Sequence, residues 1–207
     1  MTLVTLLDYA SVFVFVLTGA LVASRAQLDI VGFVFLACLT ATGGGTLRDL
    51  ILNRDPVFWV REPAIIMVAT AATVLIFFTA HLVESRYRWL LWLDAVALSV
   101  AVPAGVGVAL ATGQSATIVI LMGVMTGTFG GMLRDVVANE VPLVLKQGEL
   151  YVTAAFAGSA AGLLALSMGA DKALALLAAA GVTFALRAGS MAFGWRLPVY
   201  KSRPPRA

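Results

Sequence analysis

Two short segments carry most of the residues in this chain that could do chemistry, and each has the same pattern. The first runs from Thr40 to Asp49 and the second from Thr126 to Asp135. Both combine threonine hydroxyls, adjacent glycines and a terminal Arg-Asp pair. Such residues offer oxygen atoms and paired charges to ions rather than a nucleophile and a base. The sequence shows no nucleotide-binding loop, metal-ligand cluster or Ser/His/Asp arrangement, so we predict no enzyme activity, no catalytic residue, no metal site and no cofactor.

The glycines are predicted to interrupt two helices. Each glycine inside a helix costs about 1 kcal/mol relative to alanine, so Gly43, Gly44 and Gly45 are expected to kink or unwind one helix. Gly130 and Gly131 are expected to do the same in another. Backbone carbonyls freed at such breaks must face protein or a wet path. The alternative is close helix packing, which is the interpretation we give to the glycine pairs 123/127 and 158/162.

The Arg-Asp pairs are predicted to find partners on other helices, because adjacent residues on a helix do not face one another. Asp8 and Arg48 lie at matching depths on neighbouring antiparallel segments, and Asp94 and Arg134 repeat that relation on the opposite side. Charges at such depths are costly unless they are paired or hydrated. Two roles stay open, namely ion pairs that fasten helices and ion pairs that gate two mouths. The candidate pore and gating residues are Asp8, Thr42, Gly43, Gly44, Gly45, Thr46, Arg48, Asp49, Asp94, Thr128, Gly130, Gly131, Arg134 and Asp135.

The composition identifies the elements that must position these residues. Of 207 residues, 61% are hydrophobic and 12% are charged, about half the charge of a soluble domain. The net charge of +3 is too small to indicate nucleic acid. A bilayer needs about 20 apolar residues per helix, and the sequence predicts an all-α integral membrane protein with seven transmembrane helices. The expected spans are 7–24, 30–48, 63–83, 90–112, 116–134, 149–168 and 173–194.

An internal repeat organises these spans. Shifting the chain by 86 residues superposes Asp8 on Asp94, and the first Arg-Asp motif on the second. We therefore expect a single membrane domain over 1–207, with repeat 1 at 5–83, repeat 2 at 89–169, a seventh span at 173–195 and a basic cytoplasmic tail at 196–207. Because each repeat has three spans, the two copies are inverted, as in many transporters and pores.

The distribution of basic residues predicts the orientation. Eight Lys and Arg residues lie on the side of the C-terminus and three on the side of the N-terminus. The positive-inside rule then places the C-terminus in the cytoplasm and the N-terminus outside. The expected location is the cell inner membrane, with lipid as a partner.

Seven spans, two inverted three-span repeats and a doubled Gly-Gly-x-x-Arg-Asp motif resemble the prokaryotic members of the trimeric intracellular cation (TRIC) channel family. The bacterial sequences of this group have also been labelled putative glycine transporters. The resemblance implies a homotrimer in which each protomer holds its own potassium-permeable pore, bounded by the kinked second and fifth spans. Potassium or sodium ions and further copies of the chain would be its partners.

Two functions remain open on the residues alone. A channel would use freed carbonyls and threonine hydroxyls as a weak-field, mostly hydrated path for a monovalent cation. A secondary transporter would use the same broken helices to hold a small zwitterion such as glycine. Both need a polar route between the repeats, and the resemblance favours the channel.

Overall fold

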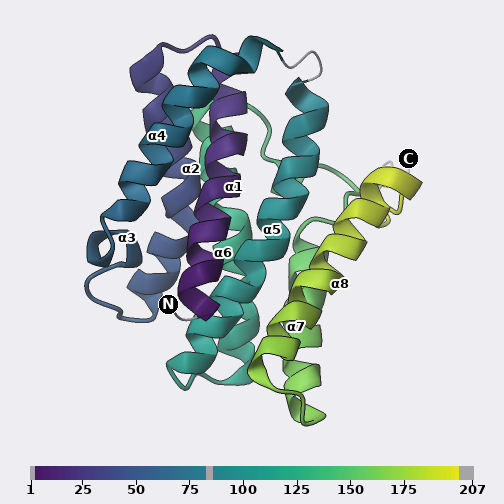
Figure 1. The fold of residues 1–207 in the computed structure, drawn as a ribbon. Helices are drawn as coiled ribbons and strands as arrows, with labels where there is room; N and C mark the ends of the chain where they lie inside the picture. Colours follow the sequence, from purple (N-terminus) through teal and green to yellow (C-terminus); the bar gives the residue numbers. More distant parts are fainter. Residues whose placement is uncertain (1–2, 83–85, 201–207) are drawn as a thin grey trace, which may run out of the picture.

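The computed structural model describes residues 3–82 and 86–200 and consists almost entirely of helices (Figure 1). The seven main helices are α1 (Leu3–Arg25), α2 (Ile30–Ile51), α4 (Ala64–Thr79), α5 (Arg86–Ala111), α6 (Ala116–Val137), α7 (Val152–Ser167) and α8 (Lys172–Phe193). Three short helices complete the described part, namely α3 (Phe58–Arg61), η1 (Ala80–Leu82) and η2 (Leu143–Leu145). The all-helical fold class is confirmed.

Six of these segments are long and apolar enough to cross a membrane, with α4 and η1 counted together as Ala64–Leu82. The remaining predicted span, α7, is apolar but has only 16 residues. It begins at Val152 rather than 149, because Glu149 instead pairs with Arg196 in an isolated β-bridge. The α2–α4 connection also contains α3, which the hydropathy pattern did not predict. Residues 201–207 of the expected basic tail lie outside the described residues.

Sequence-local signals fix several helix ends. The side chain of Asp29 accepts a hydrogen bond from the backbone N–H of Gly32 and caps α2, and Asp171 caps α8 through Leu174 in the same way. Both are favourable N-caps because they satisfy a backbone donor that the helix leaves unpaired. Gly194 ends α8 in the left-handed conformation (φ 69°), which glycine adopts without strain.

Equivalent helices of the two halves pack on each other. Within the first half α1, α2 and α4 are in mutual contact, and α5, α6 and α7 repeat this arrangement in the second. The halves meet where α1 packs on α5 and α2 packs on α6, while α8 lies against α5 and α7 at the edge of the bundle (Figure 1). The end of α1 lies beside the start of α5, since Arg25 stacks over the ring of Tyr87.

The glycine motifs form the crossing of α2 and α6. A side chain at Gly44 would collide with the carbonyl oxygen of Thr126, and one at Gly130 would collide with the carbonyl oxygen of Thr40. These two contacts are equivalent under the 86-residue offset, so the crossing lies on the pseudo-two-fold axis. Both helices remain helical through the motifs, so the prediction that glycines 43–45 and 130–131 unwind them is wrong, whereas a kink at these glycines stays a prediction. The close approach explains the glycines without a break.

The neighbouring glycines also face packed groups. Gly43 lies against the side chain of Leu133, and Gly45 lies against the ring of Phe58. The second pair of small residues interpreted as packing is confirmed, because Gly158 contacts Thr183 and a Cβ at Gly162 would be 3.1 Å from the carbonyl oxygen of Ala175. Small residues therefore bring α7 and α8 together, as they do in other membrane helix pairs.

Candidate functional site

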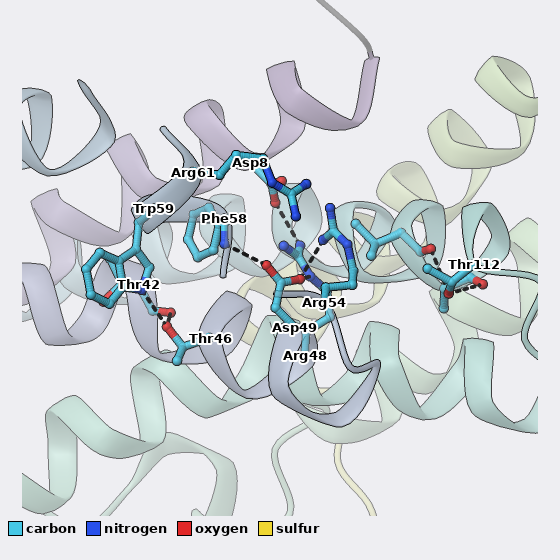
Figure 2. A network of polar contacts seen from close by, with 12 residues as sticks. Asp8, Thr42, Thr46, Arg48, Asp49, Arg54, Phe58, Trp59, Arg61 and Thr112 are labelled. Carbon is cyan, nitrogen blue, oxygen red and sulfur yellow. Dashed lines mark hydrogen bonds and ion pairs between the residues drawn. The ribbon is translucent and has the colours of Figure 1, made fainter. Parts of the chain in front are cut away.

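Four charged side chains form a network at one end of the bundle, which we call the repeat-1 mouth (Figure 2). The guanidinium of Arg48 donates through Nη1 to Asp8 Oδ1 at 2.7 Å and through Nε to Asp49 Oδ1 at 2.8 Å. Asp49 also accepts from Arg54 at 2.5 Å and from the backbone N–H of Phe58 at 2.8 Å. The network thus ties α1, α2 and the start of α3 together.

The second motif builds the same network at the opposite end, the repeat-2 mouth. Arg134 donates through Nη1 to Asp94 Oδ1 at 3.0 Å and through Nε to Asp135 Oδ1 at 2.8 Å. Asp135 in turn accepts from the backbone N–H of Leu143 at 2.9 Å. The predicted pairs Asp8–Arg48 and Asp94–Arg134 are therefore confirmed, while their role in gating stays a prediction.

The expectation that Arg48 and Asp49, or Arg134 and Asp135, do not meet is wrong. Adjacent helical residues point in different directions at Cβ, but the arginine side chain is long enough to fold back onto its neighbour. Each arginine therefore contacts two carboxylates at once, and both arginines are fully buried. Such pairing offsets the desolvation of a buried charge.

The surroundings of the two networks differ. Position 54 is Arg in repeat 1, whereas the equivalent position in repeat 2 is Glu140, which pairs with Arg25 at 3.2 Å. Position 65 is Ile in repeat 1, whereas the equivalent residue in repeat 2 is Tyr151. Asp135 therefore has one arginine partner among the described residues, while Asp49 has two.

Tyr151 is buried beside the repeat-2 network. It packs with Leu98, Val102, Leu143 and Ala155 in one apolar cluster. The guanidinium of Arg187 lies 4.9 Å from the centre of its ring, within the range of a cation–π contact.

Arg187 is fully buried and pairs with Glu149 at 2.7 Å. The segment before α7 brings Glu149 to this arginine. Four buried polar atoms in this region have no hydrogen-bond partner among the described residues, namely Asp94 Oδ2, Arg134 Nη2, Arg187 Nε and Arg187 Nη2.

Two cavities lead inward from the repeat-1 mouth. The outer one has a volume of about 410 Å³ and includes Asp8, Arg54 and Phe58 in its wall. The inner one, of about 10 Å³, lies at the α2–α6 crossing and includes Gly44 and Thr126. Asp8 and Phe58 line both cavities, so they stand between them.

The predicted threonines do not share one environment. The hydroxyls of Thr42, Thr46 and Thr128 each donate to a carbonyl four residues earlier in their own helix. Thr46 also accepts from the indole N–H of Trp59 at 2.9 Å (Figure 2). Thr126 was not among the candidates, yet its buried hydroxyl has no partner among the described residues and lines the inner cavity.

Comparison with known proteins identifies the family. A family model described as "Glycine transporter" matches residues 5–81 and again 91–167, and the two matches begin at residues that are one repeat length apart. A solved structure of the TRIC trimeric intracellular cation channel orthologue from Rhodobacter sphaeroides is 48% identical, with a TM-score of 0.90 over 94% of this chain and 100% of that one. The chain belongs to the TRIC family.

A further solved structure agrees in fold, and two more relatives agree in sequence. A prokaryotic TRIC channel solved in 0.5 M KCl is 27% identical, with a TM-score of 0.86 over 92% of this chain and 96% of that one. The UPF0126 membrane protein of Vibrio cholerae is 39% identical over 96% of this chain and 83% of its own length. The UPF0126 inner membrane protein YadS of Escherichia coli is 40% identical over 75% of each chain. This TRIC family member is therefore a multi-pass membrane protein.

Proposed function

We propose that the chain is a monovalent cation channel, permeable to potassium, with a pore between the two inverted halves of each protomer. The observation that carries the proposal is the pair of cavities that meet at Asp8 and Phe58 and lead from the repeat-1 mouth to the α2–α6 crossing. Similar proteins at 48% and 28% identity are described as TRIC cation channels. The pore would be bounded by α2 and α6, with the paired charges at its two mouths.

The oxygen atoms along this route suit a hydrated monovalent cation. The inner cavity is lined by the carboxyl-bearing Asp8 and by the hydroxyl-bearing Ser11 and Thr126. Few charges and several neutral oxygens provide a weak field, which favours large monovalent cations over small divalent ones. A volume of about 10 Å³ holds about one water molecule, so conduction requires α2 and α6 to separate at their crossing.

Single-channel recording from purified protein in planar bilayers tests this function. We expect unitary current steps in KCl and a reversal potential that follows the potassium gradient rather than the chloride gradient. Anion-selective current, or no unitary steps under any voltage, contradicts the proposal. Sodium in place of potassium should also carry current, because the residues that the structure describes form no tight filter that would exclude it.

A secondary transporter of glycine is the second candidate, and the description of the matching family model favours it. Glycine would then bind between the halves and cross as they alternate. Uptake of labelled glycine into proteoliposomes without resolvable current steps would support this function. Unitary steps without glycine uptake would exclude it, because a carrier moves too few ions per second to be resolved singly.

We further propose that the chain assembles as a homotrimer in the cell inner membrane. The resemblance to trimeric relatives supports the assembly, and light scattering with subtraction of the detergent mass tests it. A mass of one or two chains contradicts it.

Each protomer would have its N-terminus outside and its C-terminus in the cytoplasm, so that the repeat-1 mouth faces outward. The excess of Lys and Arg on the C-terminal side supports this orientation. A reporter fused after Ala207 should register as cytoplasmic, and one fused before Met1 as external. Either reporter on the opposite side contradicts it.

A further inference from the structure

The outer cavity of the repeat-1 mouth is lined by more basic than acidic side chains. Its charged wall consists of Asp8, Glu62, Arg54, Arg61 and Lys172, and its volume is about 410 Å³. These residues come from the start of α1, the α2–α4 connection and the start of α8. Figure 2 shows the guanidinium groups of Arg54 and Arg61 on the same side of the network as Asp8.

The two acids in this wall already have partners. Asp8 pairs with the buried Arg48, and Glu62 Oε2 accepts a hydrogen bond of 2.6 Å from the hydroxyl of Tyr9. Behind the wall, the positive charge of Arg48 is matched by Asp49. The cavity with its supporting network therefore keeps an excess of one positive charge.

The three basic side chains of this wall retain hydrogen-bond donors that no protein group in the described residues accepts. Arg54 uses Nη1 on Asp49, and Arg61 uses Nη2 on the carbonyl of Pro56 at 3.1 Å. Among the described residues, no hydrogen bond or ion pair occupies the remaining guanidinium nitrogens of Arg54 and Arg61, and Lys172 forms neither kind of contact. A cation entering this cavity meets like charge, whereas an anion gains charge-assisted hydrogen bonds.

We propose that this cavity binds a phosphate group at the mouth of the pore. Guanidinium groups match the oxygens of phosphate with two parallel donors, and a lysine adds a compact charge. One side of the cavity is apolar, with Val4, Ile65 and Val108 in its wall, and can accept the alkyl part of a lipid. The phosphate can therefore come from free inorganic phosphate or from an anionic lipid headgroup such as that of phosphatidylglycerol.

The equivalent positions of repeat 2 do not form such a site. The residues that match Arg54, Arg61 and Glu62 in repeat 2 are Glu140, Gln147 and Gly148, and Lys172 lies outside both repeats. The doubled motif therefore does not create this site. The site is also independent of the symmetry that relates the two halves of the proposed pore. A bound phosphate would cancel the positive excess that an entering cation meets. Binding itself does not require that the chain conduct, so the site can be tested apart from the proposed channel function.

The test measures binding to the purified chain in a maltoside detergent, which carries no phosphate. Isothermal titration with inorganic phosphate forms the first arm, and native mass spectrometry with added phosphatidylglycerol forms the second. We compare the wild type with Lys172→Gln and with the double variant Arg61→Gln/Lys172→Gln. The matched control is Arg88→Gln/Arg196→Gln, which removes two positive charges from the cavity of about 380 Å³ near the repeat-2 mouth.

We expect binding in at least one arm, weakened about tenfold (about 1.4 kcal/mol) by Lys172→Gln and further by the double variant, since each substitution removes a charge-assisted contact. The control should bind like the wild type. Phosphate binding alone identifies the free ion as the source, and lipid adducts alone identify the headgroup. No binding in either arm, or an equal loss in the control, overturns the site. Because Lys172 is exposed at the start of α8, its variant remains folded even where the double variant does not.

Discussion

At the repeat-1 mouth the Arg48–Asp8 pair adjoins a cavity, and Asp8 keeps 8% of its surface exposed. At the repeat-2 mouth the equivalent Asp94 is 0% exposed and lies beneath the cluster that contains Tyr151. The ion pairs themselves are nearly identical, so the motif alone does not decide whether a mouth is open. The residues around it do, above all the change from Ile65 to Tyr151 and from Arg54 to Glu140. The two mouths therefore differ in their surroundings: Asp8 adjoins a cavity of about 410 Å³, whereas Asp94 is enclosed by packed side chains.

Removal of the buried arginine should produce the largest difference in stability between variants of the two mouths. Arg134→Gln leaves Asp94 and Asp135 buried without an ion-pair partner, which is expected to destabilise the protein by about 3–5 kcal/mol. Arg48→Gln should cost less, because Asp8 adjoins the outer cavity and Asp49 retains Arg54. Thermal unfolding of the purified variants in detergent measures the difference, and equal losses contradict the comparison.

Double variants sharpen this test. Adding Asp8→Asn to Arg48→Gln should recover most of the lost stability, since it removes the stranded charge. Adding Asp94→Asn to Arg134→Gln should recover only part, because Asp135 stays unpaired. Strict additivity in either pair would show that its two residues do not interact.

The α2–α6 crossing should respond equally from both halves. Gly44→Ala and Gly130→Ala each place a methyl group against a backbone carbonyl of the other helix, and overpacking of this kind costs up to about 3 kcal/mol. Gly181→Ala in α8 is the matched control, since no described atom outside its chain neighbours and the backbone of its own helix lies within 4 Å of the added methyl group. Melting temperatures should fall for both crossing variants and stay level or rise for the control. A harmless Gly44→Ala, or a large difference between the two, contradicts the symmetric crossing.

Tyr151→Ile should make the repeat-2 mouth resemble the repeat-1 mouth. Loss of the ring that packs with Leu98 and Val102 should favour the open form by about 1.4 kcal/mol, or about tenfold in the ratio of open to closed channels. Tyr151→Phe keeps the ring and is the control, with an expected effect below that of Tyr151→Ile. Open probability in planar bilayers measures both, and an unchanged Tyr151→Ile excludes Tyr151 from the closure.

The smallest effect concerns the inner cavity at the α2–α6 crossing. In a chain whose Cys38 is replaced, Thr126→Cys should react with small water-soluble thiol reagents applied at the repeat-1 mouth and reduce the conductance, because Thr126 lines the inner cavity. Thr42→Cys and Thr128→Cys should react more slowly, since those hydroxyls face carbonyls of their own helices. Faster reaction at Thr42 or Thr128 would move the route away from the inner cavity.

The sequence was sufficient to predict what depends on the repeat. The apolar spans predict the helical class, and the 86-residue offset with matched depths predicts the pairs Asp8–Arg48 and Asp94–Arg134. Depth in the membrane could be inferred because it follows from the position of a residue along a regular helix. The contacts of Asp49 with Arg48 and Arg54 depend on how long side chains fold back, which residue spacing does not specify. Unwinding at the glycines was predicted from helix propensity alone. The tertiary packing of α2 on α6 instead keeps these residues helical.

The features that distinguish the two mouths were not predictable in the same way. Tyr151 and Glu149 lie in the connection before α7, and their contacts with Leu98 and Arg187 are reached only once the path of that connection is known. The one available signal was the substitution of Ile65 by Tyr151 at equivalent positions, which breaks the repeat at an apolar site. Thr126 is the equivalent of Thr40 under the 86-residue offset, but only the structure shows that the two hydroxyls differ in their partners.

The mutual contact of Gly44 with Thr126 and of Gly130 with Thr40 is self-complementary, since each half supplies both the glycine and the threonine carbonyl that the other requires. Interfaces of this kind join two copies of one polypeptide through a two-fold axis. A three-helix ancestor that inserted into the membrane in both directions would therefore form the same crossing as a homodimer. Fusion of the two genes would then free each copy to diverge, which is how one mouth could gain a tyrosine without the other.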